Sequence, residues 1–341
     1  MKEEFEMKKW QVIGLSLCCA ILLAGCQKQA QHTAASKSET STSQTVKKSQ
    51  KVTKTSQTKV EKEKPSDESL YANTLDQMRN DKTESHAAVY CFYDLNKDKQ
   101  NELIFANYYN NQPSVVSVYT LINQQATELG HSYTPSAGSY RSSIQLYQDG
   151  SIYFEKGQST SPVFHGKLLR LTNNGQIQVL KEQDYSYQET NATDVFATKD
   201  QPLLALDQLP WQSVFKQMDP TGLTMLQFAS IEGSWGNGKY QISKDQIISD
   251  NQRFVLNGVT IEENGAVKAG FYTQPIQEQS ANDSYPIAGG SMIYFIPKGV
   301  DMSTTVAGAT IQDASDHQRD RIWTGQSTTG FADASQFIYK D

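Results

Sequence analysis

The 341-residue sequence is poor in cysteine and histidine and lacks the short motifs that mark common enzyme classes. Its five histidines are His32, His86, His131, His165 and His317. They are scattered, and no two of them stand at a spacing typical of metal ligands. No Gly-x-Ser-x-Gly elbow, phosphate-binding glycine loop or dinucleotide-binding glycine pattern occurs. Because the sequence shows no such arrangement of catalytic residues, we expect a protein that is not an enzyme.

Long apolar segments are also missing. The apolar run from Trp10 to Leu23 is shorter than the roughly 20 residues that a permanent membrane-spanning helix needs. It follows two lysines and ends in small residues before Cys26, which is the order of a secretory signal. The acids before Met7 fit this order less well, and initiation at Met7 would give a cleaner signal.

The residues Leu23, Ala24, Gly25 and Cys26 resemble the lipobox of bacterial lipoproteins. The resemblance implies that residues 1–25 are a signal peptide and that the thiol of Cys26 carries diacylglycerol. Two acyl chains give stable anchoring, because each buried methylene contributes about 0.8 kcal/mol. We therefore expect a lipid-anchored Gram-positive protein on the extracellular face of the cell membrane, with the lipid bilayer as a partner.

Cysteine use excludes an internal disulfide once the signal peptide is removed. Only Cys26 and Cys91 would remain, and Cys26 would be acylated. Cys91 stands in the strand-like run AVYCFYDL, where a small buried residue is expected.

Charge is distributed unevenly along the chain. The net charge is −6; residues 1–26 sum to zero, residues 27–69 carry +4, and residues 70–341 therefore carry −10. A folded region this acidic repels a phosphate backbone, which excludes nucleic acid as a partner. Residues 26–64 consist mainly of Ser, Thr, Lys and Gln, and this composition predicts a disordered tether.

The folded part is expected to be mainly β, with two antiparallel β-rich domains at residues 65–205 and 206–341. In the first, a Ser-x-x-Ser start and the apolar spacing after it predict one amphipathic helix over residues 65–80. Short runs rich in aromatic and β-branched residues then predict a meander of strands. The pairs Asp149-Gly150 and Asn174-Gly175 are typical of two-residue hairpin turns.

In the second domain, residues 207–219 have Pro210 in their first turn and predict a short helix. The strands after it are expected to turn at Asn-Gly pairs, which begin at Asn237, Asn257 and Asn264. The opening Gly233-x-Trp235 resembles the first strand of lipocalin-type barrels. We therefore expect a small barrel or a curled sheet, and a ligand-holding barrel would have an apolar cavity behind Trp235.

Three segments, TGLTMLQFASIEGSWGNGKYQIS, GGSMIYFIPKGV and SDHQRDRIWTG, together resemble an uncharacterised domain family at the C-terminus of Gram-positive surface lipoproteins. The shared elements include Ile231, Gly233 and Trp235 in the first segment and Asp320 to Ile322 in the last. That family has no established activity, so the resemblance identifies a module and assigns it no role.

The stretch YDLNKDKQNELI places Asp94, Asn96 and Asp98 at alternate positions and Glu102 at the ninth. It resembles the Asp-x-Asn-x-Asp loops of extracellular Gram-positive proteins, which implies that these four residues can ligate Ca²⁺. Lys99 stands where an EF-hand loop needs glycine, and Asp and Asn also stabilise ordinary turns. The sequence therefore leaves two interpretations of this stretch, a calcium site and a structural turn.

The charged run SDHQRDRI contains the candidate ligand-binding residues Arg319, Asp320 and Arg321. Arginine binds carboxylate or phosphate through two parallel hydrogen bonds, which would suit an anion-recognition patch. The alternative is a self-satisfied ion-pair corner that holds the last strands together.

These expectations describe a membrane-anchored extracellular lipoprotein that binds or scaffolds an unidentified extracellular or cell-wall partner. Two alternatives are open: a hydrolase or modifying enzyme acting on the cell wall, and a lipocalin-like carrier of small molecules.

Overall fold

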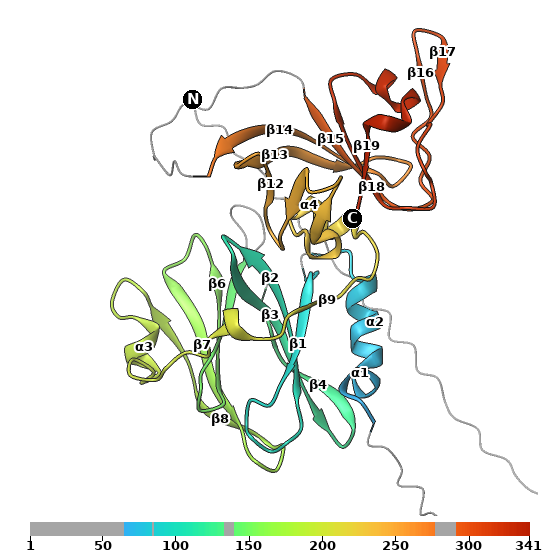
Figure 1. Ribbon diagram of the computed structural model, residues 1–341. Coiled ribbons are helices and arrows are strands. Elements are labelled where there is room, and N and C mark those ends of the chain that lie inside the picture. Colours follow the sequence, from blue (N-terminus) through green and yellow to red (C-terminus); the bar gives the residue numbers. More distant parts are fainter. Residues whose placement is uncertain (1–64, 84, 133–139, 277–290) are drawn as a thin grey trace, which may run out of the picture. The chain divides into compact units, whose positions relative to one another are not determined.

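The computed structural model describes residues 65–83, 85–132, 140–276 and 291–341. The described residues all belong to one compact unit of the chain. The predicted signal peptide, Cys26 and the tether lie outside the described residues. The compact unit is mainly β, as predicted (Figure 1). Among the described residues, no helix is long and apolar enough to cross a membrane.

Two short helices, α1 (Asp67–Leu70) and α2 (Ala72–Asn80), form where one helix was predicted. The hydroxyl of Ser66 accepts the amide proton of Ser69 and thereby caps α1, as the Ser-x-x-Ser pattern indicated. Tyr71 separates the two helices and is fully buried.

A five-stranded antiparallel sheet, in the order β4-β3-β2-β1-β9, packs against α2. Its strands are β1 (Val89–Tyr93), β2 (Glu102–Tyr109), β3 (Gln112–Ile122), β4 (Gln125–His131) and β9 (Gln212–Ser213). Leu75 and Met78 of α2 pack on Tyr90, Leu103 and Phe105 of this sheet. The apolar face of the helix therefore forms one side of the first core.

A four-stranded antiparallel sheet, in the order β5-β6-β7-β8, covers the opposite face. Its strands are β5 (Tyr140–Leu146), β6 (Ser151–Gln158), β7 (Val163–Leu171) and β8 (Ile177–Ser186). Cys91 and Ile104 of the first sheet meet Ile144 and Ile152 of the second. The outer face of the second sheet carries α3 (Ala192–Val195), since Tyr153 and Leu168 pack with its neighbouring Phe196.

The helix predicted over residues 207–219 is wrong. The segment forms a 3₁₀ turn, η1 (Leu206–Gln208), and then strand β9, which pairs with β1. Leu209 precedes a proline and is extended (φ −75°, ψ 149°), which is the conformation that a following proline favours. Because Trp211 and Val214 pack in the cores of the two sheets, we call residues 65–215 the first β region and 216–341 the second.

The second β region begins with α4 (Pro220–Thr224) and η2 (Ala229–Ile231) and is dominated by an eight-stranded antiparallel sheet. The strands are, in sheet order, β10 (Gly233–Trp235), β11 (Tyr240–Ile242), β12 (Ile247–Ser249), β13 (Gln252–Ile261), β14 (Val267–Pro275), β15 (Met292–Ile296), β18 (Arg321–Gly325) and β19 (Phe337–Tyr339). The sheet curls until it is nearly closed, because Trp235 forms a β-bridge with Lys340. The predicted curled sheet is confirmed.

Three short elements complete this region. They are the hairpin of β16 (Thr304–Val306) and β17 (Ala309–Ile311) and the 3₁₀ turns η3 (Thr328–Ala332) and η4 (Ala334–Gln336).

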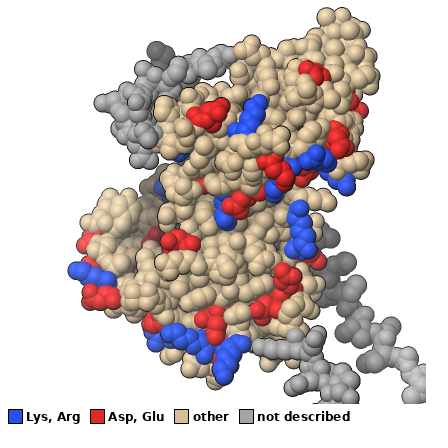
Figure 2. All heavy atoms as spheres, in the orientation of Figure 1, with Lys and Arg blue, Asp and Glu red and all other residues tan. Residues whose placement is uncertain are grey.

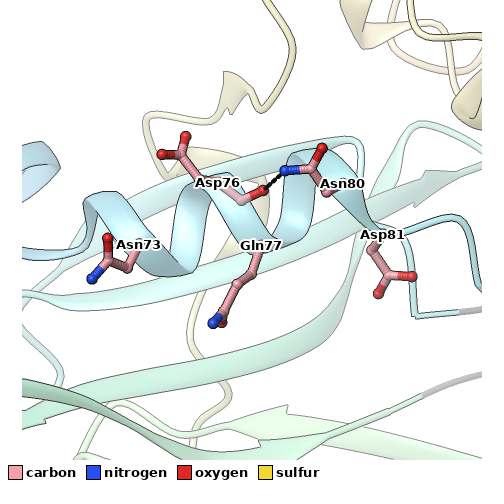
Figure 3. Close-up of a pocket in the computed structure, with 5 residues that line it drawn as sticks. All are labelled: Asn73, Asp76, Gln77, Asn80 and Asp81. Atoms are coloured by element: carbon pink, nitrogen blue, oxygen red, sulfur yellow. Dashed lines mark hydrogen bonds between the residues drawn. The ribbon is translucent and has the colours of Figure 1, made fainter.

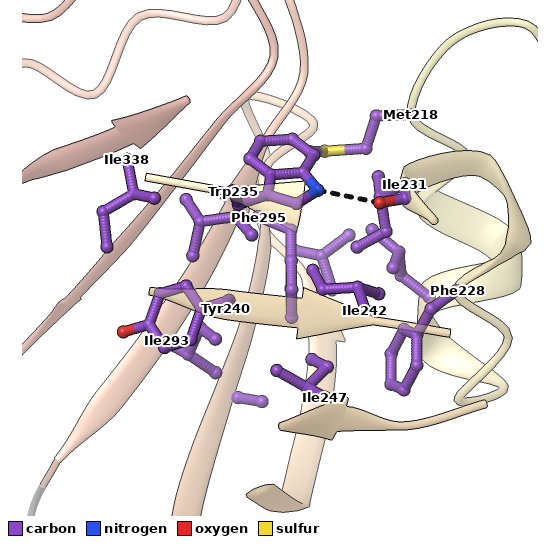
Figure 4. Close-up of a cluster of buried hydrophobic side chains, with 14 residues drawn as sticks. Met218, Phe228, Ile231, Trp235, Tyr240, Ile242, Ile247, Ile293, Phe295 and Ile338 are labelled. Atoms are coloured by element: carbon purple, nitrogen blue, oxygen red, sulfur yellow. Dashed lines mark hydrogen bonds between the residues drawn. The ribbon is translucent and has the colours of Figure 1, made fainter. Parts of the chain in front are cut away.

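Apolar side chains fill the described interior of the curled sheet (Figure 4). The indole nitrogen of Trp235 donates a hydrogen bond to the carbonyl oxygen of Ile231 at 2.8 Å, and the ring is 1% exposed. Met218, Ile231 and Ile338 surround this ring. Packed side chains thus occupy the space behind Trp235 where a carrier would need a cavity.

Two of the three Asn-Gly turns form where they were predicted, between β10 and β11 and between β13 and β14. The turn expected at Asn257 is wrong. Strand β13 continues through this pair, and its register with β14 shifts between Asn257 and Thr260, with Gly258 at φ 58°. The glycine therefore allows a β-bulge rather than a turn.

Candidate functional site

The loop between β1 and β2 contains three of the four predicted calcium ligands, Asp94, Asn96 and Asp98, and the fourth, Glu102, begins β2. The carboxylate of Asp94 accepts hydrogen bonds from the amides of Asp98 (3.0 Å) and Lys99 (2.9 Å). The carboxylate of Asp98 accepts one from the amide of Gln100 at 2.8 Å. The loop thus uses its acidic side chains to satisfy its own backbone, as Asx turns do.

Asn96 and Lys99 show how this loop is fixed and where it is strained. The side-chain amide of Asn96 donates to the carbonyl oxygen of Thr172 at 2.9 Å, which ties the loop to the turn between β7 and β8. Lys97 and Lys99 have φ values of 61° and 72°, in the left-handed region that favours glycine. The loop therefore adopts a glycine-like backbone without a glycine.

Glu102 lies behind this loop and is fully buried. One carboxylate oxygen accepts the amide proton of Leu95 (2.9 Å) and the other accepts the hydroxyl proton of Thr120 (3.0 Å). Burial raises the pKa of Glu102 to about 7, and the negative charges of Asp98 and Asp94 add to the rise. Near neutral pH this carboxyl group therefore lies close to the midpoint of its titration.

The structure does not gather Asp94, Asp98 and Glu102 around a common point. Among the described His, Cys, Asp and Glu side chains, one group of three has its ligand atoms within 4.8 Å of one another, and it lies elsewhere. To join a calcium shell with Asp94 and Asp98, the side chain of Glu102 would have to leave its present partners. Calcium binding at this loop stays a prediction.

The three predicted anion-binding residues of the last segment have separate protein partners. The guanidinium group of Arg319 lies 4.5 Å from the ring centroid of Tyr339. The carboxylate of Asp320 accepts the amide protons of Lys298 (2.7 Å) and Met218 (3.1 Å). The three side chains therefore do not form one patch in this structure.

Arg321 is fully buried in what we call the Asp313 corner, which consists of Asp301, Asp313, His317 and Arg321. Its guanidinium group donates to the carboxylate of Asp313 at 2.8 Å and to the carbonyl oxygen of Val300 at 2.6 Å. These bonds hold β18 to the two segments that flank the hairpin of β16 and β17. The geometry fits the alternative of an ion-pair corner, although Nε of Arg321 has no hydrogen-bond partner among the described residues.

Asp313 is the centre of this corner. Its burial opposes ionisation, but hydrogen bonds from Ser315, Met302 and Arg321 outweigh this effect and lower the pKa of the carboxyl group. The imidazole of His317 lies 3.0 Å from the same carboxylate oxygen that Arg321 contacts. Asp301, Asp313 and His317 form the group of three potential metal ligands mentioned above, but Arg321 already supplies a positive charge there.

A groove that no sequence pattern indicated runs between α2 and the segment around β9. We call it the α2 groove. Two adjoining hollows of about 430 and 490 Å³ share Arg79, Phe215 and Lys216 as lining residues. The other lining residues are Glu68, Ala72, Leu75, Tyr90, Gln212 and Ser213 in the first hollow and Lys82, Gln217, Met218, Asp219 and Pro220 in the second.

The α2 groove is lined by the cations Arg79, Lys82 and Lys216 and by the acids Glu68 and Asp219. Arg79 forms an ion pair with Asp76 (2.7 Å) and donates to the carbonyl oxygen of Val214 (3.0 Å), so its position is fixed. Lys82 and Lys216 are exposed and have no ion-pair partner among the described residues. Figure 2 shows red and blue side chains interspersed over a largely uncharged face, so the basic character is local to small areas rather than a broad basic surface.

The other side of α2 carries a third hollow, which has a polar lining (Figure 3). Its residues are Asn73, Asp76, Gln77, Asn80 and Asp81. The side-chain amide of Asn80 donates to the carbonyl oxygen of Asp76 at 2.8 Å, and the other side chains project outward. The exposed side of α2 therefore offers hydrogen-bonding groups next to the basic groove.

Cys91 is buried between the two sheets of the first β region, as expected. Burial raises the pKa of its thiol to about 12, so the reactive thiolate form is scarce at neutral pH. The predicted acylation site, Cys26, lies outside the described residues.

Comparisons of the chain with protein-family models, with curated proteins and with solved structures find no match. The lipobox, the C-terminal domain and the Asp-x-Asn-x-Asp loop therefore rest on the residues quoted for them.

Proposed function

We propose that this chain is an extracellular binding lipoprotein without enzymatic activity, anchored through acylated Cys26, whose α2 groove binds an anionic group of a cell-wall polymer. The observation that carries the proposal is the placement of Arg79, Lys82 and Lys216 along one groove in a sequence region, residues 70–341, with a net charge of −10. Three cations in one groove complement single anionic groups of a partner, whereas the net negative charge of the whole region repels the dense phosphate backbone of nucleic acid.

The chemistry of the groove suits recognition. The guanidinium group of Arg79 is held in place by Asp76 and Val214, so its remaining donors are oriented before a ligand arrives. Lys82 and Lys216 contribute mobile point charges, and Tyr90 and Phe215 provide apolar walls. A polymer that carries phosphate or carboxylate groups along a flexible backbone would match this combination.

Binding of an isolated wall polymer with phosphodiester groups tests the proposal. The full chain, purified in detergent, is compared with a K82E/K216E variant and with a K156E/K199E variant, whose exposed lysines lie outside the groove. Both variants have the same net charge. We expect the groove variant to bind at least about tenfold more weakly, and the control to resemble the wild type. Equal binding by all three proteins contradicts the role of the groove.

The anchor is tested separately. Replacement of Cys26 by Ala removes the thiol to which diacylglycerol would be attached, so the protein is expected to leave the membrane fraction of the cell and appear in the medium or the wall fraction. Retention of the Cys26→Ala variant in the membrane, with an unchanged response to detergent, would show that another feature holds the chain there.

A further inference from the structure

A buried histidine and a buried aspartate join the two β regions beneath the α2 groove. Nε2 of His86 lies 2.6 Å from Oδ2 of Asp219, and the side chains are 0% and 3% exposed. Nδ1 of the same ring lies 2.9 Å from the backbone carbonyl oxygen of Asp81. Both ring nitrogens thus face oxygen atoms.

These contacts determine how many protons the pair must hold. A carbonyl oxygen can only accept, so Nδ1 must carry a proton. An ionised carboxylate can also only accept, so the 2.6 Å contact requires either a second proton on the ring or a protonated carboxyl group that donates to Nε2. In both cases the pair holds one proton more than a neutral histidine and an ionised aspartate would.

The pair connects segments that are far apart in the sequence. His86 stands just before β1, and its carbonyl oxygen accepts a hydrogen bond from the side chain of Asn107 at 2.9 Å. Asp219 is the N-cap residue of α4, and its amide donates to the hydroxyl of Ser230 at 3.1 Å. The ring of His86 stacks on Phe215, with centroids 5.1 Å apart. Neither side chain can move without disturbing the junction of the regions.

The charged groups around the pair have partners of their own or lie on the groove. From α2, Arg79 is bonded to Asp76; from the segment after it, the carboxylate of Asp81 accepts the amide proton of Thr83. Beside Asp219, the amide of Met218 is bonded to Asp320. Lys82 and Lys216 line the same hollow as Asp219.

Within the pair itself, Oδ1 of Asp219 has no hydrogen-bond partner in the part of the chain that the structure describes. The proton shared with His86 is therefore the direct compensation for the buried carboxylate.

We propose that His86 and Asp219 form a proton-dependent latch that fastens α4 and the preceding segment to the first β region and opens as the pH rises. An exposed histidine has an ordinary pKa of about 6.5 and is neutral above this pH. In that pH range the closed latch therefore holds one proton more than the open one. Closure then weakens by up to about tenfold for each further pH unit. The groove above the latch contains Phe215 and Asp219, so the same change would alter the groove.

The variant Asp219→Asn isolates the role of the proton. Its carboxamide can donate a hydrogen bond to Nε2 of a neutral His86, so the contact survives without the additional proton. Hydrogen exchange of the full chain, corrected for the intrinsic effect of pH, is measured at pH about 5.5, 7 and 8.5, which span the ordinary histidine pKa. Peptides from residues 81–88 and 214–224 report on the latch, and a peptide from β13 and β14 is the internal control.

In the wild type, we expect protection of the two latch peptides to fall by at least about tenfold between the extreme pH values, while the control peptide stays constant. In the Asp219→Asn variant, protection of the two latch peptides should change with pH no more than protection of the control peptide does. Constant protection in the wild type, or the same decline in the variant, overturns the proposal.

A second measurement on the wild type does not depend on the folding of a variant. Imidazole ¹⁵N and carboxyl ¹³C chemical shifts at pH about 7 report the protonation of His86 and Asp219 directly. We expect a protonated ring or a protonated carboxyl group. A neutral ring beside an ionised carboxylate overturns the latch.

Discussion

Glu102 in the first β region and Asp313 in the second are both carboxyl groups withdrawn from water, but their pKa values move in opposite directions. Glu102 has neutral hydrogen-bond donors, Leu95 and Thr120, and burial raises its pKa to about 7. Asp313 receives hydrogen bonds from Ser315 and from the buried guanidinium group of Arg321, and its pKa is lowered despite burial.

This difference shows that burial alone does not fix the charge of a carboxyl group. At the Asp313 corner the partners favour the ionised form, so the ion pair is a structural element. At Glu102 the partners do not compensate fully for the loss of water, and Asp94 and Asp98 add negative charge nearby. Of these two carboxyl groups, Glu102 is therefore the one whose charge a change of pH near neutrality would alter.

The largest effect is expected from removal of the cation at the Asp313 corner. Replacement of Arg321 by Met keeps much of the side-chain volume but leaves Asp313 buried without its guanidinium partner. We expect a loss of about 3–5 kcal/mol in the free energy of unfolding, measured by chemical denaturation. The matched variant Arg319→Met removes an exposed arginine and should cost less than about 1 kcal/mol. Equal costs for the two changes would mean that the corner does not depend on its ion pair.

A smaller effect, dependent on pH, is expected at Glu102. Its pKa rises from 4.5 to about 7 on folding, so the folded state binds the proton more tightly. The stabilisation from protonated Glu102 is fully present below pH 4.5 and is lost as the pH rises to about 7. The difference corresponds to a loss on the order of 3 kcal/mol. In Glu102→Gln the carboxamide cannot ionise, and its two ends can still bond to Leu95 and Thr120.

The free energy of unfolding of Glu102→Gln should therefore lack the decline that the wild type shows between pH about 4.5 and 7. The effect of pH on stability at Asp313 has the opposite sign. Because the pKa of Asp313 is lowered on folding, its contribution to the free energy of unfolding is lost as the pH falls below the ordinary value of 3.8. A wild-type protein whose stability does not fall between pH about 4.5 and 7 would disagree with the buried position of Glu102.

The sequence predicted local structure well where the local pattern was strong. Strand β2 begins and ends at the residues of the run ELIFANYY, and the Asp149-Gly150 and Asn174-Gly175 turns join the expected strands. The helix over residues 207–219 was wrong because β9 pairs with a strand more than one hundred residues earlier, which no local pattern contains. The α2 groove was missed for the same reason, since its residues come from two distant segments.

The predicted sites divide in the same way. The alternation of Asp94, Asn96 and Asp98 predicted a tight polar turn, and the structure has one. The direction in which the side chain of Glu102 points depends on its hydrogen bond with Thr120 in the next strand. The spacing of the acidic residues in the sequence does not reveal that contact. For Arg319, Asp320 and Arg321, nearness in sequence suggested one patch, but residues adjacent in sequence contact different partners once β18 is paired on both edges.

The strain at Lys99 predicts a gain in stability. Lys99 has φ 72°, and glycine adopts this conformation without the cost of a side chain, although it adds freedom to the unfolded chain. We expect Lys99→Gly to stabilise the protein by about 0.5–1 kcal/mol in chemical denaturation. Lys156→Gly, in strand β6, removes an equal charge from an extended backbone and should be destabilising. If Lys99→Gly is also destabilising, the lysine side chain contributes more to stability than the protein gains when the backbone strain is relieved.

The smallest effect is expected from calcium. The hydrogen bonds of the Asp94 loop are complete without a cation, and the carboxyl group of Glu102 faces Leu95 and Thr120. We therefore expect millimolar calcium to shift the unfolding midpoint of the wild type by less than about 1 °C, because a ligand near its dissociation constant adds less than about 0.5 kcal/mol. Lys99→Gly restores the glycine that calcium loops use at this position, so it is the more sensitive host. A clear rise of the midpoint in the wild type that Asp94→Asn abolishes would establish the predicted metal site, and it would mean that Glu102 turns toward the ion when calcium binds.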